Sequence, residues 1–155
     1  MKVYPILFSQ IYCIDNEKIL LLRRTKEPNL GLWVAPGGKI EADESPYECA
    51  LRELFEESGL EPDKLYLRGI ISLIFPDAKE CSIQFVYLAT DFRGRLKREN
   101  DEGILEWQPI KSLTSLPAPS EISCYLSKII DIHNGIYQAK ITYDENYNVL
   151  NVEEY

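Results

Sequence analysis

One stretch in the first third of the chain constrains the fold most, because both ends of a helix are marked in it. Ser45 is a natural N-cap, and Glu48, three residues later, completes a capping box. Pro46 suits the first helical position, where its missing N–H costs no hydrogen bond. Gly59 suits the left-handed residue that follows a helix. The sequence therefore predicts a helix from Pro46 to Ser58.

The two faces of this helix differ sharply in charge. At 100° per residue, apolar side chains gather on one half, while Arg52, Glu53, Glu56 and Glu57 occupy the other. Glu53 lies one turn from the other two glutamates, which places their Cβ atoms about 5–6 Å apart. Such carboxylates repel one another, and the helix dipole disfavours anions near the C-terminus. This arrangement therefore favours a bound cation. Mg²⁺ is a suitable one, because it prefers hard oxygen ligands such as carboxylates. The alternative is a solvated acidic face.

The rest of the chain predicts a sheet and one further helix. Runs rich in β-branched and aromatic residues alternate with turn residues, as is typical of short strands. A second helix is predicted over 119–133 with Ser120 as its cap, and 99–103 reads as an acidic loop. We therefore expect residues 1–155 to form a single domain, an α/β sandwich with a mixed, mostly antiparallel sheet and two main helices. The predicted strands are 3–14, 18–24, 34–40 (broken around its Pro-Gly-Gly), 65–75, 82–91 (closed by a turn at 93–95), 106–110, 136–143 and 147–152.

The charge and cysteine content exclude several classes of protein. Lys and Arg number 17 against 25 Asp and Glu, so the formal net charge is −8. Because nucleic-acid binding needs a basic surface, we expect no DNA or RNA partner. No apolar run approaches the roughly 18 residues of a membrane span, so we expect no membrane partner. The 4 cysteines form no CxxC pair, which argues against structural zinc and favours reduced thiols in the cytoplasm.

The predicted first helix belongs to a longer pattern that starts at Gly38 and reads GKIEADESPYECALRELFEESGL. This pattern resembles the Nudix box, G-x5-E-x7-R-E-U-x-E-E-x-G-U with U aliphatic, at every fixed position. Seven fixed residues at a background of roughly 6% each match by chance on the order of once in 10⁹ registers. The resemblance implies an α/β/α sandwich that hydrolyses a nucleoside diphosphate linked to another group, using Mg²⁺ or, as an alternative, Mn²⁺.

The resemblance also implies which residues hold the metal. Glu53, Glu56 and Glu57 occupy the positions of its carboxylate ligands. The backbone carbonyl of Gly37 or Gly38 is implied as a further ligand. A metal held there would neutralise phosphate oxygens and activate a water molecule for attack.

Two other residues of the box are implied to support these ligands. Arg52 should orient Glu53 through a salt bridge, and Glu44 should in turn hold Arg52. A ligand carboxylate works best when its own orientation is fixed in this way. The general base is either a box glutamate or a later acid, for which the candidates are Glu99, Asp101, Glu102 and Glu106. We favour Glu102, five residues before Trp107, as base and additional metal ligand, a spacing similar to that of MutT-like relatives.

Three basic residues are candidates for contacting the substrate phosphates. Arg23 and Arg24 end a predicted strand, and Lys39 follows the glycine pair. Because neighbouring residues on a strand face opposite ways, at most one of Arg23 and Arg24 should enter the cleft.

The region from Gly31 to Glu41 and the C-terminal hairpin are similar to the MutT-like branch of the family. Members of that branch cleave nucleoside triphosphates, including oxidised purine nucleotides, to the monophosphate and pyrophosphate. The resemblance implies that Glu121 reads the base. The aromatic candidates for stacking on the base are Trp33, Phe75, Phe85 and Trp107.

Two positions keep other substrates open. Val34 stands where some purine-reading relatives carry an amide, and Pro76 lies 16 residues after Leu60, a spacing associated with ADP-ribose-cleaving relatives. ADP-ribose or another dinucleotide-type diphosphate is therefore the alternative substrate. A non-catalytic, nucleotide-sensing domain is a further alternative, although such domains typically lose box glutamates. In each case the expected partner is a small nucleotide, and the protein is a monomer or a homodimer.

Overall fold

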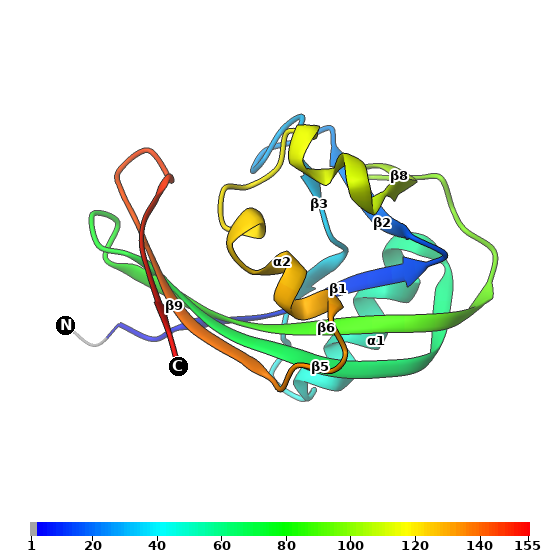
Figure 1. Cartoon of the computed structure of the whole chain (residues 1–155), viewed down its shortest axis with the longest axis horizontal. Helices are drawn as coiled ribbons and strands as arrows, with labels where there is room; N and C mark the ends of the chain where they lie inside the picture. The colour runs from blue at the N-terminus through cyan, green and yellow to red at the C-terminus, as the bar shows by residue number, and fades with distance from the viewer. Residues whose placement is uncertain (1–2) are drawn as a thin grey trace.

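The computed structural model describes residues 3–155 and shows a long, strongly curved sheet with a helix on each face (Figure 1). Two α-helices and one 3-10 helix, η1, accompany ten strands in this part of the chain. The elements in chain order are β1 (Ile6–Asp15), β2 (Lys18–Arg24), β3 (Trp33–Val34), β4 (Gly37–Lys39), α1 (Pro46–Ser58), β5 (Leu60–Phe75), β6 (Glu80–Gly94), β7 (Glu99–Asn100), β8 (Gly103–Pro109), η1 (Ile110–Ser115), α2 (Ile122–Ile130), β9 (Tyr137–Tyr143) and β10 (Val149–Glu154).

The sheet is mixed and mostly antiparallel, as predicted. The strand order is β10-β9-β5-β6-β1-β2-β8-β7, with β3 paired to β2 and β4 paired to β1. Within residues 3–155, β1 with β6 and β5 with β9 are the parallel pairs. The pairing of β4 places Gly37 opposite Gln10 and Gly38 opposite Ser9. The glycine pair therefore lies at a fixed position beside the central strand β1, where it leads into α1.

Each face of the sheet has its own hydrophobic core. Along β1, Tyr12 packs into one core, while its neighbours Ile11 and Cys13 pack into the other. We call the first the α2-side core, because helix α2 adds Tyr125 and three other residues to it. The second is the α1-side core, to which α1 adds Leu54 and one other residue. This alternation confirms the α/β/α sandwich.

Helix α1 confirms the prediction from its capping residues. The Ser45 hydroxyl accepts from the Glu48 backbone N–H at 3.2 Å, and the Glu48 carboxylate accepts from the Ser45 backbone N–H at 2.8 Å. At the other end, Gly59 has φ 74°, and its N–H donates to the carbonyl of Phe55 at 2.8 Å. The helix spans Pro46–Ser58, as expected.

The second helix differs from the prediction at both ends. It begins at Ile122 and ends at Ile130, so it is shorter than 119–133. Ser120 is not its cap, because the N-cap position belongs to Glu121, whose side chain makes no capping hydrogen bond. Its inner face is apolar, and Tyr125 and Ile129 on that face are fully buried. This helix is held by its packing and not by a strong local start signal.

Several strand boundaries also differ, because pairing across the sheet extends or divides them. Strand β6 extends into the turn predicted at 93–95 and ends at Gly94, which pairs with Leu60. The same pairing makes β5 begin at Leu60, earlier than predicted. The predicted strand 34–40 is divided into β3 and β4, and the predicted loop 99–103 contains β7. Helix η1 was not predicted. No helix within 3–155 is long and apolar enough to cross a membrane.

A buried arginine joins the sheet to the end of α2. Arg68 lies where the register of β5 on β6 shifts between Leu67 and Gly69, and its exposed fraction is 7%. Its Nε donates to the carbonyl of Ile129 at 3.2 Å, and its Nη2 donates to that of Asp131. These bonds satisfy carbonyl groups that have no partner within the helix.

Candidate active site

Arg52 is the centre of the ion-pair network on the charged face of α1. Its Nε and Nη2 donate to the two carboxylate oxygens of Glu44, at 2.9 and 2.5 Å. Its Nη1 donates to Oε1 of Glu53 at 2.8 Å. The predicted contacts among these three residues are thereby confirmed. Arg52 and the backbone N–H of Glu41 lower the pKa of Glu44 to about 2, so this carboxylate stays charged and keeps the guanidinium in place.

The carboxylate of Glu53 lies directly against the backbone of Gly38. A Cβ atom at position 38 would fall 2.2 Å from Oε1 of Glu53, which is too close for any side chain. Burial raises the pKa of Glu53, while the hydrogen bond and charge of Arg52 act in the opposite direction. Helix α1 and strand β4 thus hold this carboxylate from two sides.

Glu57 is the most buried of the three box glutamates. Its exposed fraction is 8%, and its Oε2 has no hydrogen-bond partner within the part of the chain that the structure describes. Burial, together with the charges of Glu102 and Glu53, raises the pKa of Glu57 to about 8. A buried carboxylate oxygen without a partner is costly in a protein interior. A divalent cation would supply the missing partner, so the residues present fit Mg²⁺.

The third box glutamate is exposed. The Glu56 side chain is 58% exposed and lies 3.4 Å from Nη1 of Arg52. Over residues 3–155, no three acidic, histidine or cysteine side chains converge as closely as a metal site requires. Glu53 and Glu56 both pair with Arg52, at 2.8 and 3.4 Å. Binding a metal here therefore requires a change of their side-chain rotamers.

Glu102 comes to this site from the turn between β7 and β8. Its charge raises the pKa of both Glu53 and Glu57, and its carboxylate accepts from Nη1 of Arg24 at 2.8 Å. Of the other later acids, Glu106 instead accepts from the Gln108 side chain at 3.0 Å. The role of Glu102 as base or metal ligand stays a prediction.

Asn100 is a residue of this site that the sequence argument missed. Its Oδ1 accepts from the backbone N–H groups of Glu102 and Gly103, at 2.8 and 3.0 Å. Its Nδ2 donates to the carbonyl of Glu57 at 3.0 Å. Asn100 therefore ties the Glu102 turn to helix α1. The signal available in the sequence was an asparagine three residues before a glycine, which is typical of a side-chain-capped turn.

The three basic candidates have different surroundings. Arg24 is tied to Glu102 and donates through Nε to the carbonyl of Pro28 at 2.5 Å. Arg23 is exposed, and strand alternation places it on the opposite face of β2, as predicted. Lys39 is exposed, and its carbonyl accepts from Nη2 of Arg52 at 3.2 Å. Arg23 and Lys39 are therefore the more available cations.

The aromatic candidates do not form one cluster, because they lie on both faces of the sheet. Trp33 and Phe75 pack on the α2-side core, whereas Phe85 and Trp107 pack on the α1-side core. Phe75 stacks on Tyr143, with ring centroids 4.6 Å apart. Burial raises the pKa of Glu121, whose charge in turn helps to raise that of Tyr143. Because both contact Tyr143, Glu121 and Phe75 lie on the same side of the sheet.

Comparison with known proteins agrees with this geometry. The model of the NUDIX domain matches residues 9–125. The uncharacterized Nudix hydrolase YvcI of Bacillus subtilis is 30% identical, over 87% of this chain and 85% of its own. The ADP-ribose pyrophosphatase of Methanocaldococcus jannaschii is 33% identical, over 75% of this chain and 72% of its own. The crystal structure of the mutator MutT protein of Bacillus halodurans superposes with a TM-score of 0.86 at 27% identity, covering 96% of this chain and 97% of that one.

The fold, the box and these matches show that the chain belongs to the Nudix family. Within it, the protein is a MutT-like Nudix hydrolase, a pyrophosphohydrolase that acts on nucleotide diphosphate-linked substrates. This assignment sets aside the alternative of a non-catalytic sensor.

Proposed function

We propose that the protein hydrolyses a nucleoside triphosphate to the monophosphate and pyrophosphate, with Mg²⁺ held by Glu53, Glu56 and Glu57. The observation that carries the proposal is the buried oxygen of Glu57, which has no hydrogen-bond partner in the described part of the chain. The charges of the nearby Glu102 and Glu53 raise the pKa of this carboxylate. When bound there, Mg²⁺ would supply charge neutralisation for the phosphates and a water of lowered pKa. Mn²⁺ has the same preference for oxygen ligands and is the alternative metal.

The chain's own residues then have distinct roles. Arg52 fixes the carboxylate of Glu53, and Glu44 fixes Arg52. The backbone carbonyl of Gly37 or Gly38 completes the ligand set. Together these contacts orient the ligands before the substrate arrives, which is how supporting residues contribute to a metal site.

Glu102 is proposed as the general base. Its side chain is 49% exposed, so it can exchange a proton with solvent, and its pairing with Arg24 restricts its position. A base of this kind takes the proton of the attacking water as the bond to phosphorus forms.

Further residues are proposed to bind the rest of the nucleotide. Arg23 and Lys39 would contact the phosphates, while Glu121 would read the base and Trp33 or Phe75 would stack on it. The likeness to the mutator MutT protein supports a triphosphate. So does the 8-oxo-dGTP diphosphatase of Proteus vulgaris, which is 30% identical over 87 residues, or 56% of this chain and 76% of its own.

ADP-ribose is the second candidate substrate. The relative from Methanocaldococcus jannaschii favours it, because that match extends over 121 residues. The spacing of Pro76 from Leu60 points the same way. Both substrates contain the diphosphate that the proposed metal site would bind.

Product analysis separates the two candidates. The enzyme is incubated with Mg²⁺ and a panel of normal and oxidised nucleoside triphosphates, ADP-ribose and dinucleoside polyphosphates. Pyrophosphate and a monophosphate from one triphosphate, at a rate well above the rest, would support the proposal. Faster cleavage of ADP-ribose would replace it with the second candidate. The Glu57→Gln variant serves as the control for a contaminating phosphatase, because it should be inactive on every substrate.

A further inference from the structure

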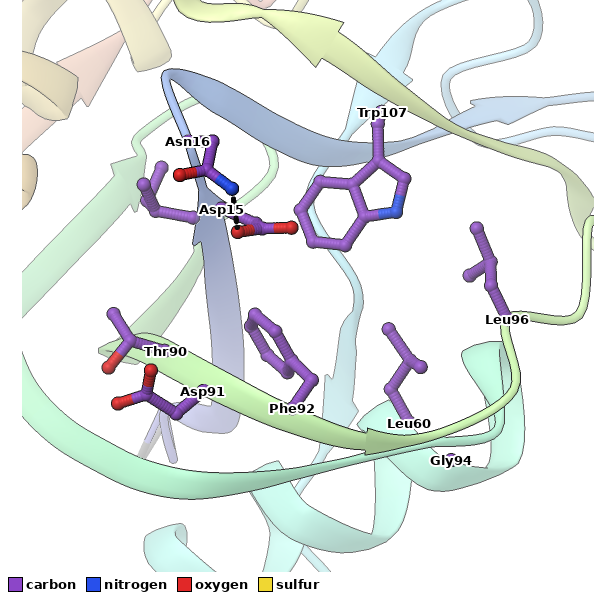
Figure 2. A pocket seen from close by; sticks show the side chains of 10 residues that line it. Asp15, Asn16, Leu60, Thr90, Asp91, Phe92, Gly94, Leu96 and Trp107 are labelled. Atoms are coloured by element: carbon purple, nitrogen blue, oxygen red, sulfur yellow. Dashed lines mark hydrogen bonds between the residues drawn. The ribbon is translucent and has the colours of Figure 1, made fainter.

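A cavity of about 550 Å³ lies beside the α1-side core, away from the proposed metal ligands (Figure 2). It opens between the β1–β2 turn, the end of β6 and strand β8. Leu60, Phe92, Leu96 and Trp107 supply the apolar part of its lining, beside polar side chains such as Asp15 and Thr90. The volume falls in the range of small-molecule sites, and polar groups form more of its surface than apolar ones do. None of Glu53, Glu56 and Glu57 lines it, so the cavity is separate from the proposed active site.

An aromatic pair forms one wall of the cavity. The rings of Phe92 and Trp107 meet at 60°, with their centroids 5.8 Å apart. In Figure 2 the carboxylate of Asp15 extends toward the six-membered ring of Trp107. A carboxylate and an indole ring that border the same space are the two groups that attract an ammonium ion most strongly.

The charged side chains that line the cavity are all acidic. Asp15 and Asp91 line it, while no lysine or arginine does. Asp91 is paired with Lys64 at 3.0 Å. Asp15 makes no ion pair in the described part of the chain, even with Lys18, its cross-strand neighbour, and accepts only the Asn16 side-chain amide at 2.9 Å. The cavity therefore repels anions such as nucleotides and carries one carboxylate without a positive partner.

We infer that this cavity binds a small organic cation, an ammonium group on an apolar body. The ammonium group lies between the Asp15 carboxylate and the Trp107 ring, and the apolar body lies against Phe92 and Leu60. The ring face and the carboxylate both attract the ammonium group. Burial of the apolar body against Phe92 and Leu60 contributes further to binding. This site takes the opposite charge from the polyphosphate substrate of the proposed active site.

The chain offers a direct spectroscopic test, because it contains only two tryptophans, Trp33 and Trp107. Benzyltrimethylammonium is titrated into ¹⁵N-labelled protein, and the two indole N–H signals are followed, with Trp33→Phe identifying which is which. The Trp107 signal should shift in a saturable way, while the Trp33 signal, which reports the other face of the sheet, should not. Phenylacetate, an anion of similar shape, should leave both signals in place.

A pair of matched variants tests the role of charge. Asp15→Asn should weaken binding of the cation about 2- to 5-fold, as expected for one exposed carboxylate. Asp77→Asn removes the same charge from the exposed β5–β6 turn and should leave binding unchanged. The amide spectrum without probe shows whether each variant is folded. The inference is overturned if phenylacetate binds as tightly, if both indole signals move together, or if the folded Asp15 variant keeps its full affinity.

Discussion

Both carboxylate oxygens of Glu44 accept hydrogen bonds from the guanidinium of Arg52, at 2.9 and 2.5 Å. The third nitrogen of that guanidinium holds Glu53, so a glutamate in the loop before α1 sets the position of a glutamate on the helix. A planar fork of donors is needed for this relay, which a lysine side chain does not provide. The relay is therefore specific to arginine.

Arg52→Ala and Arg52→Lys should both lower turnover by about 10- to 100-fold, since neither keeps the bonds to Glu44 and Glu53 together. Pyrophosphate release at saturating Mg²⁺ measures this loss. Arg93→Ala removes an exposed arginine paired with Asp63 and should keep its activity. Full activity in Arg52→Lys would show that only the positive charge matters.

Gly38→Ala should lower activity at least about 10-fold with little loss of stability, because the new methyl group displaces the Glu53 carboxylate. Gly135→Ala is the matched control, since a Cβ there meets nothing within 4 Å. Turnover and the thermal midpoint are measured for both variants. Equal activity in the two would mean that Glu53 does not need its position against β4.

The free energy of unfolding of the metal-free protein should fall as the pH rises from about 5 to 8. Folding raises the pKa of Glu57 from 4.5 to about 8, so the native state holds a proton that the unfolded state releases over this range. Below pH 4.5 both states are protonated, and the penalty disappears. Urea unfolding in EDTA at several pH values measures this fall in the free energy of unfolding. The fall should be smaller in Glu57→Gln by roughly 2–4 kcal/mol.

Glu61→Gln is the control for that pH series, because Glu61 is exposed on β5. It should follow the wild-type curve. A Glu57→Gln curve parallel to wild type would show that the carboxylate is not buried with a raised pKa.

Mg²⁺ should raise the thermal midpoint of the wild-type protein, because a ligand that binds only the folded state stabilises it. The rise should be concentration-dependent, reversed by EDTA and much smaller in Glu57→Gln. Calorimetry without substrate separates this effect from catalysis. An equal rise in the two proteins would place the metal away from Glu57.

Arg68→Met should destabilise the protein by about 1.5–3 kcal/mol, since it leaves the carbonyls of Ile129 and Asp131 without their charged donor. Arg98→Met, at an exposed position, should have little effect. Urea unfolding monitors both variants. A stable Arg68 variant would mean that α2 is held by its apolar face alone.

The sequence by itself determined helix α1 and the chemistry on its charged face. The capping residues Ser45, Glu48 and Gly59 act within a few residues of one another, and the glutamates share a face through helical spacing alone. Capping and the shared face are set by short-range geometry, so they can be derived without knowing the fold. The contacts of Arg52 with Glu44 and Glu53 were instead implied by the resemblance to the Nudix box.

Only the tertiary structure decided how distant segments meet. The pairing of β7 with β8 brought Asn100 and Glu102 to α1, 43 residues separating Asn100 from Glu57. The bulge in β5 placed Arg68 at the end of α2, and strand alternation divided the aromatic candidates between two cores. These contacts depend on strand register, which is fixed by burial over the whole sheet and leaves no local signal in the sequence.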